Sequence, residues 1–188
     1  MVCRESRSAV RQVRGRASAW PNLSGMRTLL LLRHAKSDYP SGIGDHDRPL
    51  APRGIREAGL AGDWLRAEAP PIDAVLCSTA TRTRQTLERT GIEAPVRFAD
   101  RIYDATPGIV LGEINGVADD VQTLLVIGHE PVMSGLALAL ADDHSDADVV
   151  AEIESKYPTS ALALLRVPTP WRELEVGGAQ LAGFHVPR

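Results

Sequence analysis

An unbroken run of four leucines, at residues 29–32, is followed directly by Arg33 and His34. Consecutive apolar residues over this length are typical of a β-strand that is covered on both faces. Side chains at the end of such a strand are held by a rigid element rather than by a loose loop. The run therefore predicts a central strand whose carboxyl end presents a cation and an imidazole.

The rest of the chain alternates between strand-like and helical patterns. Strands are expected at residues 28–32, 74–77, 123–127 and 161–167, with a closing strand at 179–186. Helices are expected at residues 53–67, 79–90, 107–116 and 131–141, and the first carries Ile55, Ala58, Leu60 and Leu65 on one apolar stripe. This alternation predicts an α/β fold, a single three-layer domain with a mostly parallel central sheet flanked by helices. The acidic stretch 142–148 is expected to be a solvated loop.

Charge divides the chain into a basic beginning and an acidic remainder. Residues 1–25 hold five arginines and one acidic residue, whereas the rest holds 16 basic and 23 acidic side chains. We expect residues 1–25 to be a disordered extension and residues 26–188 to form the domain. A nucleic-acid or membrane arm is the alternative for the basic segment. The acidic body argues against nucleic acid as the main partner.

Composition excludes several classes of protein. No run of 18 apolar residues is present, so neither a membrane span nor a membrane partner is expected. Cys3 and Cys77 form no disulfide framework, which favours a reducing, cytoplasmic location. The five histidines show no metal-ligand spacing, so we expect no metal and no other cofactor.

Polar residues follow three of the predicted strands. Arg33 and His34 follow the first, Ser78 and a helix containing Arg82 follow the second, and His129 follows the third. In open α/β sheets, ligands bind beyond the carboxyl ends of the strands. We therefore expect two arginines and two histidines to converge on one crevice.

These residue types suit phosphoryl transfer. Two guanidinium groups can hold phosphoryl oxygens through forked, charge-assisted hydrogen bonds. One imidazole can attack phosphorus and carry it covalently, and the other can stabilise charge in the transition state. Each residue alone has an ordinary interpretation as a surface, turn or solvated helix residue. Their joint occurrence at three strand ends favours a site.

Three segments, "LRHAKS", "CSTATRTRQTLE" and "VIGHEP", resemble the signatures of the histidine phosphatase superfamily, also called phosphoglycerate-mutase-like. Ala35 stands where that family usually has glycine, and Thr79 where it has proline. The short chain and the stretches "RHAKS", "DRPLAPRG" and "YPTSALALL" further resemble the SixA branch of phosphohistidine phosphatases. The resemblance extends from Met26 to the C-terminus.

The resemblance implies a phosphoglycerate-mutase-like fold and a role for each motif residue. His34 is implied to be the nucleophile that becomes phosphohistidine, and Arg33, Arg82 and His129 are implied to complete the phosphate pocket. Ser37 falls where the family often has a hydroxyl near the phosphate, and a local turn or cap explains it equally well. Arg48 could guide phosphate or contact a partner, with a salt-bridged loop as the alternative.

One catalytic group is missing from the sequence. Cleavage of a phosphomonoester expels an alkoxide, which calls for a general acid. Larger members of the family supply a glutamate from an inserted region, for which this chain has little room. No acidic residue stands out among the candidates, which are Asp38, Asp45, Asp47, Asp104 and Glu130; Glu93 and Glu113 are expected to be solvated or on a helix face.

The missing acid affects which substrate we expect. A phosphorylated histidine can leave as neutral imidazole if its other ring nitrogen is protonated, which is accessible near a pKa of about 6.5. We therefore expect a metal-independent phosphatase that acts through phospho-His34 on a phosphohistidine of a partner protein. A phosphatase of small phosphomonoesters is the alternative among enzymes. A catalytically silent phosphate-binding or partner-docking module is the alternative of another class.

Overall fold

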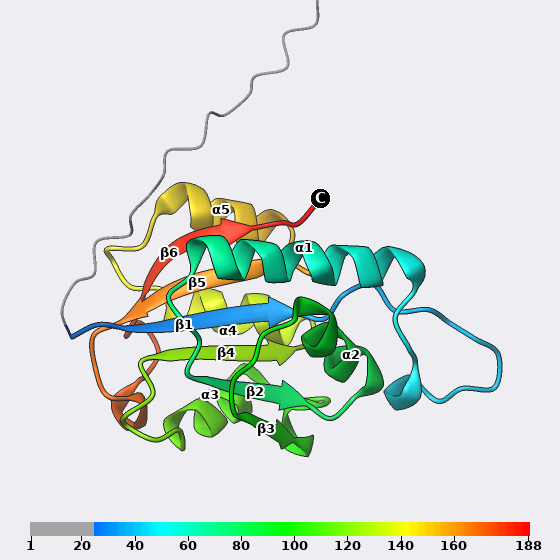
Figure 1. Ribbon diagram of the computed structural model, residues 1–188. Coiled ribbons are helices and arrows are strands. Elements are labelled where there is room, and N and C mark those ends of the chain that lie inside the picture. Colours follow the sequence, from blue (N-terminus) through cyan, green and yellow to red (C-terminus); the bar gives the residue numbers. More distant parts are fainter. Residues whose placement is uncertain (1–24) are drawn as a thin grey trace, which may run out of the picture.

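A computed structural model describes residues 25–188, and its core is one six-stranded sheet (Figure 1). The strands are β1 (Arg27–Arg33), β2 (Ala74–Ser78), β3 (Val96–Ala99), β4 (Thr123–Gly128), β5 (Leu162–Val167) and β6 (Gln180–His185), in the order β3-β2-β4-β1-β5-β6. The first four strands of this order are mutually parallel, and β5 is antiparallel to both β1 and β6. The predicted α/β fold with a mostly parallel sheet is thus confirmed.

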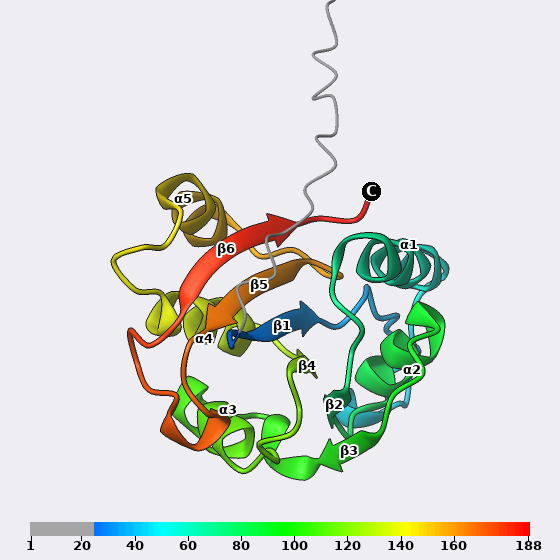
Figure 2. The same ribbon diagram turned by 60° about the vertical axis from the view of Figure 1, so that its left-hand side comes forward.

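Helices cover both faces of the sheet (Figure 2). They are α1 (Pro52–Glu68), α2 (Thr81–Thr90), α3 (Pro107–Asn115), α4 (Val132–Leu140) and α5 (Ala147–Ser155). Figure 2 shows α1 and α2 on one side of the sheet and α3, α4 and α5 on the other. The result is the three-layer arrangement that the alternating pattern predicts.

The leucine run lies in β1, between β4 and β5, and is buried on both faces. Leu29 and Leu31 pack into the core cluster that contains residues of α3 and α4, and Leu30 and Leu32 pack into the cluster under α1 and α2. All four side chains are inaccessible to solvent. Because both faces are covered, the strand shows no alternation of apolar and polar residues.

Helix α1 packs through small residues, and the predicted apolar stripe is partly wrong. Ile55 and Leu60 are 40% and 41% exposed. A Cβ placed on Gly54 would lie 2.1 Å from the carbonyl oxygen of Lys36, so the helix approaches that segment closely. This contact selects the buried face of the helix, which consists of Gly54, Glu57, Ala58, Ala61, Gly62 and Leu65.

Two elements are absent from the sequence prediction. Strand β3 lies at the edge of the sheet and exposes its first three residues, so it gives no burial signal. Helix α5 begins inside the stretch that we expected to be a loop, which is a correction at residues 147 and 148. Its N-cap, Asp146, accepts hydrogen bonds from the N–H groups of Asp148 and Val149. Acidic residues here cap a helix as well as face solvent.

The prediction for residues 1–25 lies outside the described residues, apart from Gly25. Between residues 25 and 188, none of the helices combines the length and the apolar character needed to cross a membrane.

Candidate active site

The carboxyl ends of β2, β4 and β1 meet at one edge of the sheet because these strands are neighbours. Arg33, the last residue of β1, pairs in register with Gly128, the last residue of β4. The His34 N–H then donates to the Gly128 carbonyl at 3.0 Å. As a result the rings of His34 and His129 lie 5.2 Å apart between centroids. The four residues predicted to converge do lie together, with Arg82 in the first turn of α2.

The tautomer of His34 follows from one hydrogen bond. Its Nδ1 lies 2.7 Å from the carbonyl oxygen of Ala35, which can only accept, so Nδ1 carries the proton. Burial lowers the pKa of His34 to about 3, and the ring is therefore neutral at pH 7. A neutral ring protonated at Nδ1 has its lone pair on Nε2. His34 thus meets the electronic requirement of a nitrogen nucleophile.

Alanine at position 35 causes no backbone strain. The non-glycine residues with positive φ in the described chain are Asp104 and Ser160, so Ala35 does not adopt a conformation that favours glycine. Its side chain is fully buried, and its N–H donates to Thr86 Oγ1 at 2.9 Å. The departure from the family pattern at this position leaves the geometry of His34 intact.

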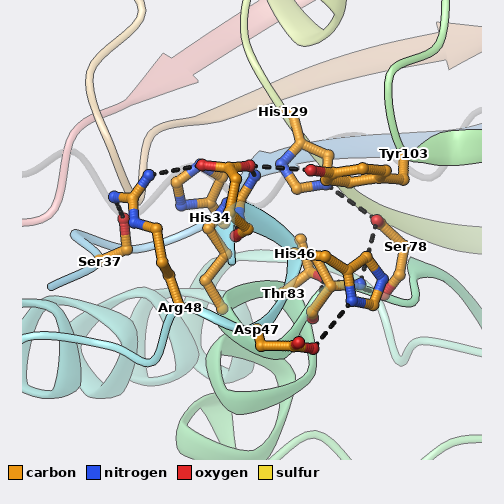
Figure 3. Close-up of polar contacts among 12 residues, drawn as sticks. His34, Ser37, His46, Asp47, Arg48, Ser78, Thr83, Tyr103 and His129 are labelled. Atoms are coloured by element: carbon orange, nitrogen blue, oxygen red, sulfur yellow. Dashed lines mark hydrogen bonds and ion pairs between the residues drawn. The ribbon is translucent and has the colours of Figure 1, made fainter. Parts of the chain in front are cut away.

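His129 is held by Ser78 at the end of β2. Its Nε2 lies 2.8 Å from Ser78 Oγ (Figure 3), whereas its buried Nδ1 has no partner within the described residues. Burial and the charge of Arg82 lower the pKa of His129 to about 4. A second neutral imidazole therefore lies beside His34.

Arg33 is anchored from the antiparallel side of the sheet. Its Nη1 donates to the Tyr157 carbonyl at 2.6 Å, and the Tyr157 hydroxyl donates to the Leu31 carbonyl at 2.6 Å. Burial lowers the pKa of Arg33. The buried Nε of Arg33 has no partner in the described chain. Unpartnered buried donors are uncommon and call for an explanation such as a ligand.

The loop between β1 and α1 extends past the strand ends (Figure 1) and brings Asp45 onto the site. Arg82 donates from Nη1 to the Asp45 carbonyl at 2.6 Å and from Nη2 to Asp45 Oδ2 at 3.0 Å. Tyr103 donates its hydroxyl to the same carboxylate oxygen at 2.9 Å, and Arg48 donates to Oδ1 at 2.7 Å. Hydrogen bonds from Tyr103 and Arg48 hold the pKa of Asp45 at about 2.

Arg48, which is largely buried, and Ser37, which is buried, lie beside this cluster (Figure 3). Arg48 donates from Nη2 to Ser37 Oγ at 2.5 Å, and its guanidinium stacks on the Tyr39 ring at 3.4 Å. Both residues thus adjoin the four central side chains through Asp45. The salt-bridged loop that we weighed for Arg48 is present, and a role with phosphate stays a prediction for both residues.

The acidic residues considered as general acids differ in their contacts and exposure. Asp45 is ionised at neutral pH, and Asp47 is exposed beside His46. Glu130 accepts from the N–H and hydroxyl of Ser134, and Glu113, expected to be solvated or on a helix face, lies in α3 and forms an ion pair with Arg97. Because it is ionised, Asp45 offers no protonated carboxyl to a leaving group. Among residues 25–188 no group of three or more metal-ligating side chains is found.

The sequence interpretation did not single out Asp45 and Tyr103 as a contacting pair. They are 58 residues apart, and the contact depends on the conformation of two loops. The available signal in the sequence was the acidic turn before Arg48.

The fold brings two histidines and two arginines together at one edge of a mostly parallel sheet, and comparison with known proteins gives the family. The family model of the histidine phosphatase superfamily (branch 1) matches residues 29–123. The chain therefore belongs to the histidine phosphatase superfamily.

Relatives and solved structures agree with this assignment. An uncharacterized protein of Mycobacterium tuberculosis is 64% identical over 158 residues, which cover 84% of this chain and all of that protein. The phosphohistidine phosphatase SixA of Escherichia coli is 28% identical over 142 residues, covering 72% of this chain and 82% of SixA. The structure of a proposed SixA from Nakamurella multipartitia matches with a TM-score of 0.81 and 38% identity, covering 87% of this chain and 98% of that one.

Proposed function

We propose that this protein is a phosphatase that acts through a covalent phosphohistidine on His34. The observation that carries the proposal is the state of His34: a buried, neutral imidazole with its proton fixed on Nδ1 and its lone pair on Nε2. Such a ring is ready to attack phosphorus without prior loss of a proton. The strand and its neighbours hold it, so little entropy is lost when substrate binds.

The groups around His34 suit a phosphoryl group. Arg33 Nε and His129 Nδ1 are buried without a partner among residues 25–188, and an anion would satisfy donors at these positions. Arg82 uses two of its five N–H groups on Asp45, which leaves others for phosphoryl oxygens. Arg33, Arg82 and His129 would thus bind the transferring group and stabilise its charge. No metal ion or other cofactor enters this scheme.

The proposed reaction has two steps, transfer of the phosphoryl group to His34 and hydrolysis of phospho-His34. His34 Nε2 forms a bond to phosphorus while the bond to the leaving group breaks, and the leaving group takes the bonding electron pair. Water then attacks phospho-His34, which releases inorganic phosphate and restores the imidazole. Both steps require space on the side of phosphorus opposite Nε2, because the leaving group departs there in the first step and water attacks from there in the second.

Phosphohistidine of a partner protein is the substrate we propose. Asp45, the carboxylate bound to Arg82, is ionised at neutral pH and supplies no proton, and an imidazole leaving group needs less protonation than an alkoxide does. Similarity to SixA, whose name records phosphohistidine phosphatase activity, supports the same choice. The two cysteines, of which Cys77 is buried and unpaired, support a reducing, cytoplasmic setting.

A parallel rate measurement on the full chain tests this proposal. The wild type is given a phosphohistidine-bearing protein domain and 4-nitrophenyl phosphate, and His34→Ala is the inactive variant, with His144→Ala as a matched control on an exposed loop. We expect faster cleavage of phosphohistidine, loss of activity in His34→Ala only, and an acid-labile phosphoryl group trapped on the wild type. Cleavage of the aryl phosphate alone would favour a small-molecule phosphatase, and no cleavage of either would favour a binding module.

A further inference from the structure

Asp45 is exposed to solvent and also contacts the buried Arg82 at the bottom of the site. Its side chain is 55% exposed, yet it contacts Arg82, whose side chain is only 8% exposed. His34 is 9% exposed and lies at the floor. An in-line attack by His34 places the leaving group on the far side of phosphorus, toward solvent. Asp45 is therefore a carboxylate on the solvent-facing side of the site, which is the side toward which the proposed reaction directs the leaving group.

The hydrogen bonds of Asp45 leave it one acceptor position. Oδ2 accepts from Arg82 and Tyr103, and Oδ1 accepts from Arg48. A carboxylate has about four lone-pair positions, so one position on Oδ1 has no donor in these contacts. With three donors already bound, the group is an acceptor and not a source of protons. An alkoxide departing toward it would meet like charge, whereas an N–H group would meet a hydrogen-bond acceptor.

We propose that Asp45 determines leaving-group specificity by accepting a hydrogen bond from the ring N–H of a departing imidazole, so that the site favours phosphohistidine over phosphate monoesters. This inference rests on the proposed function. As the phosphorus–nitrogen bond breaks, its electron pair returns to the substrate nitrogen. The other ring nitrogen keeps its proton, held by Asp45, and the product is neutral imidazole. A phosphate monoester carries no such donor and gains nothing from the carboxylate.

The test compares two substrates on one preparation of the full-length protein. Asp45→Asn replaces a charged acceptor by a neutral amide of the same size, and the substrates are free phosphohistidine and 4-nitrophenyl phosphate. The free amino acid removes any contribution of partner docking. The ratio of the two kcat/KM values does not depend on the fraction of folded protein, so a partly misfolded variant still gives an answer. Asp47→Asn is the matched control, since Asp47 lies on the same turn and its side chain is 74% exposed.

We expect Asp45→Asn to lower the ratio of phosphohistidine to aryl phosphate cleavage about 10- to 100-fold, as for a lost hydrogen bond to a charged group. Asp47→Asn should leave the ratio unchanged. An equal fall in kcat/KM for both substrates would show that Asp45 only orients Arg82. An equal rise in kcat/KM for both would show that Asp45 competes with phosphate for Arg82. Either result, or an unchanged ratio, overturns the inference. A wild type that cannot cleave phosphohistidine overturns the proposed function as well, which separates the two failures.

Discussion

Helix α1 contacts the segment after His34 at a point where only glycine fits, and Gly54→Ala tests what that contact does. A Cβ on Gly54 would lie 2.1 Å from the Lys36 carbonyl oxygen and 2.9 Å from the Lys36 N and C atoms. These are backbone atoms and cannot rotate away. The same carbonyl accepts from the Ala51 N–H at 2.9 Å, just before α1 begins. The added methyl group must therefore push the helix and the His34 segment apart.

The size of the effect follows from the missing space. Ordinary contact begins at 3.4 Å, so the gap has to open by about 1.3 Å. Overpacking costs about 1–3 kcal/mol, and rigid backbone on the opposing side favours the upper end. The better helix propensity of alanine returns about 1 kcal/mol. The net loss is about 2 kcal/mol, which corresponds to a Tm lower by about 4–8 °C for a chain of this size.

Thermal unfolding followed by circular dichroism measures this loss, with Gly59→Ala as the control. Gly59 lies in the same helix, and a Cβ there meets nothing within 4 Å, so alanine should stabilise by about 0.5–1 kcal/mol. Because a shift of about 1 Å at reacting groups can cost about 100-fold, kcat/KM should fall by that order in Gly54→Ala and stay unchanged in the control. A Gly54→Ala protein as stable as the control would refute the close contact.

Two further predictions concern buried ionisable groups. The folded pKa values of His34 and His129, about 3 and about 4, lie below the ordinary value of 6.5, so the unfolded chain binds more protons and stability is lost as pH falls below 6.5. Urea unfolding should show that the free energy of unfolding falls by about 2 kcal/mol for each histidine between pH 7 and pH 5. In His34→Ala this fall should be smaller than in the wild type by about 2 kcal/mol. An equal fall in both proteins would contradict the lowered pKa of His34. Glu57, buried between two half-exposed arginines, should cost about 1 kcal/mol when changed to Gln, with kcat/KM unchanged. Chemical denaturation and a rate assay check both parts, and unchanged stability would show that these ion pairs contribute nothing.

The strand ends were predictable because the signal is local in the sequence. An apolar run that stops at Arg33 and His34 shows both the strand and what it presents, and the same holds for Ile127 and His129. Parallel neighbours then bring such ends together without further information. The edge strand β3 and helix α5 bury little, so they gave no comparable signal.

The rim of the site was not predictable in the same way. Asp45 joins Arg48, Arg82 and Tyr103 through a loop whose path depends on tertiary contacts. From sequence alone, this aspartate resembled the other acidic residues near it. The largest cause of its low pKa is the hydrogen bond from Tyr103, which is 58 residues away in the chain, so the exclusion of Asp45 as an acid depends on the tertiary structure.

The position of the leucine run explains why the nucleophile follows it. The backbone N–H of His34 donates to the carbonyl of Gly128 at the end of the neighbouring strand β4, and the carbonyl of His34 accepts from the N–H of Ser160 on the antiparallel side. Its ring Nδ1–H donates to the carbonyl of Ala35. A histidine at an edge strand would have a neighbour on one side only and would lose one of these constraints. His34 therefore keeps its Nε2 lone pair in one direction because it follows a strand in the middle of the sheet. Such a strand is covered on both faces and is apolar on both.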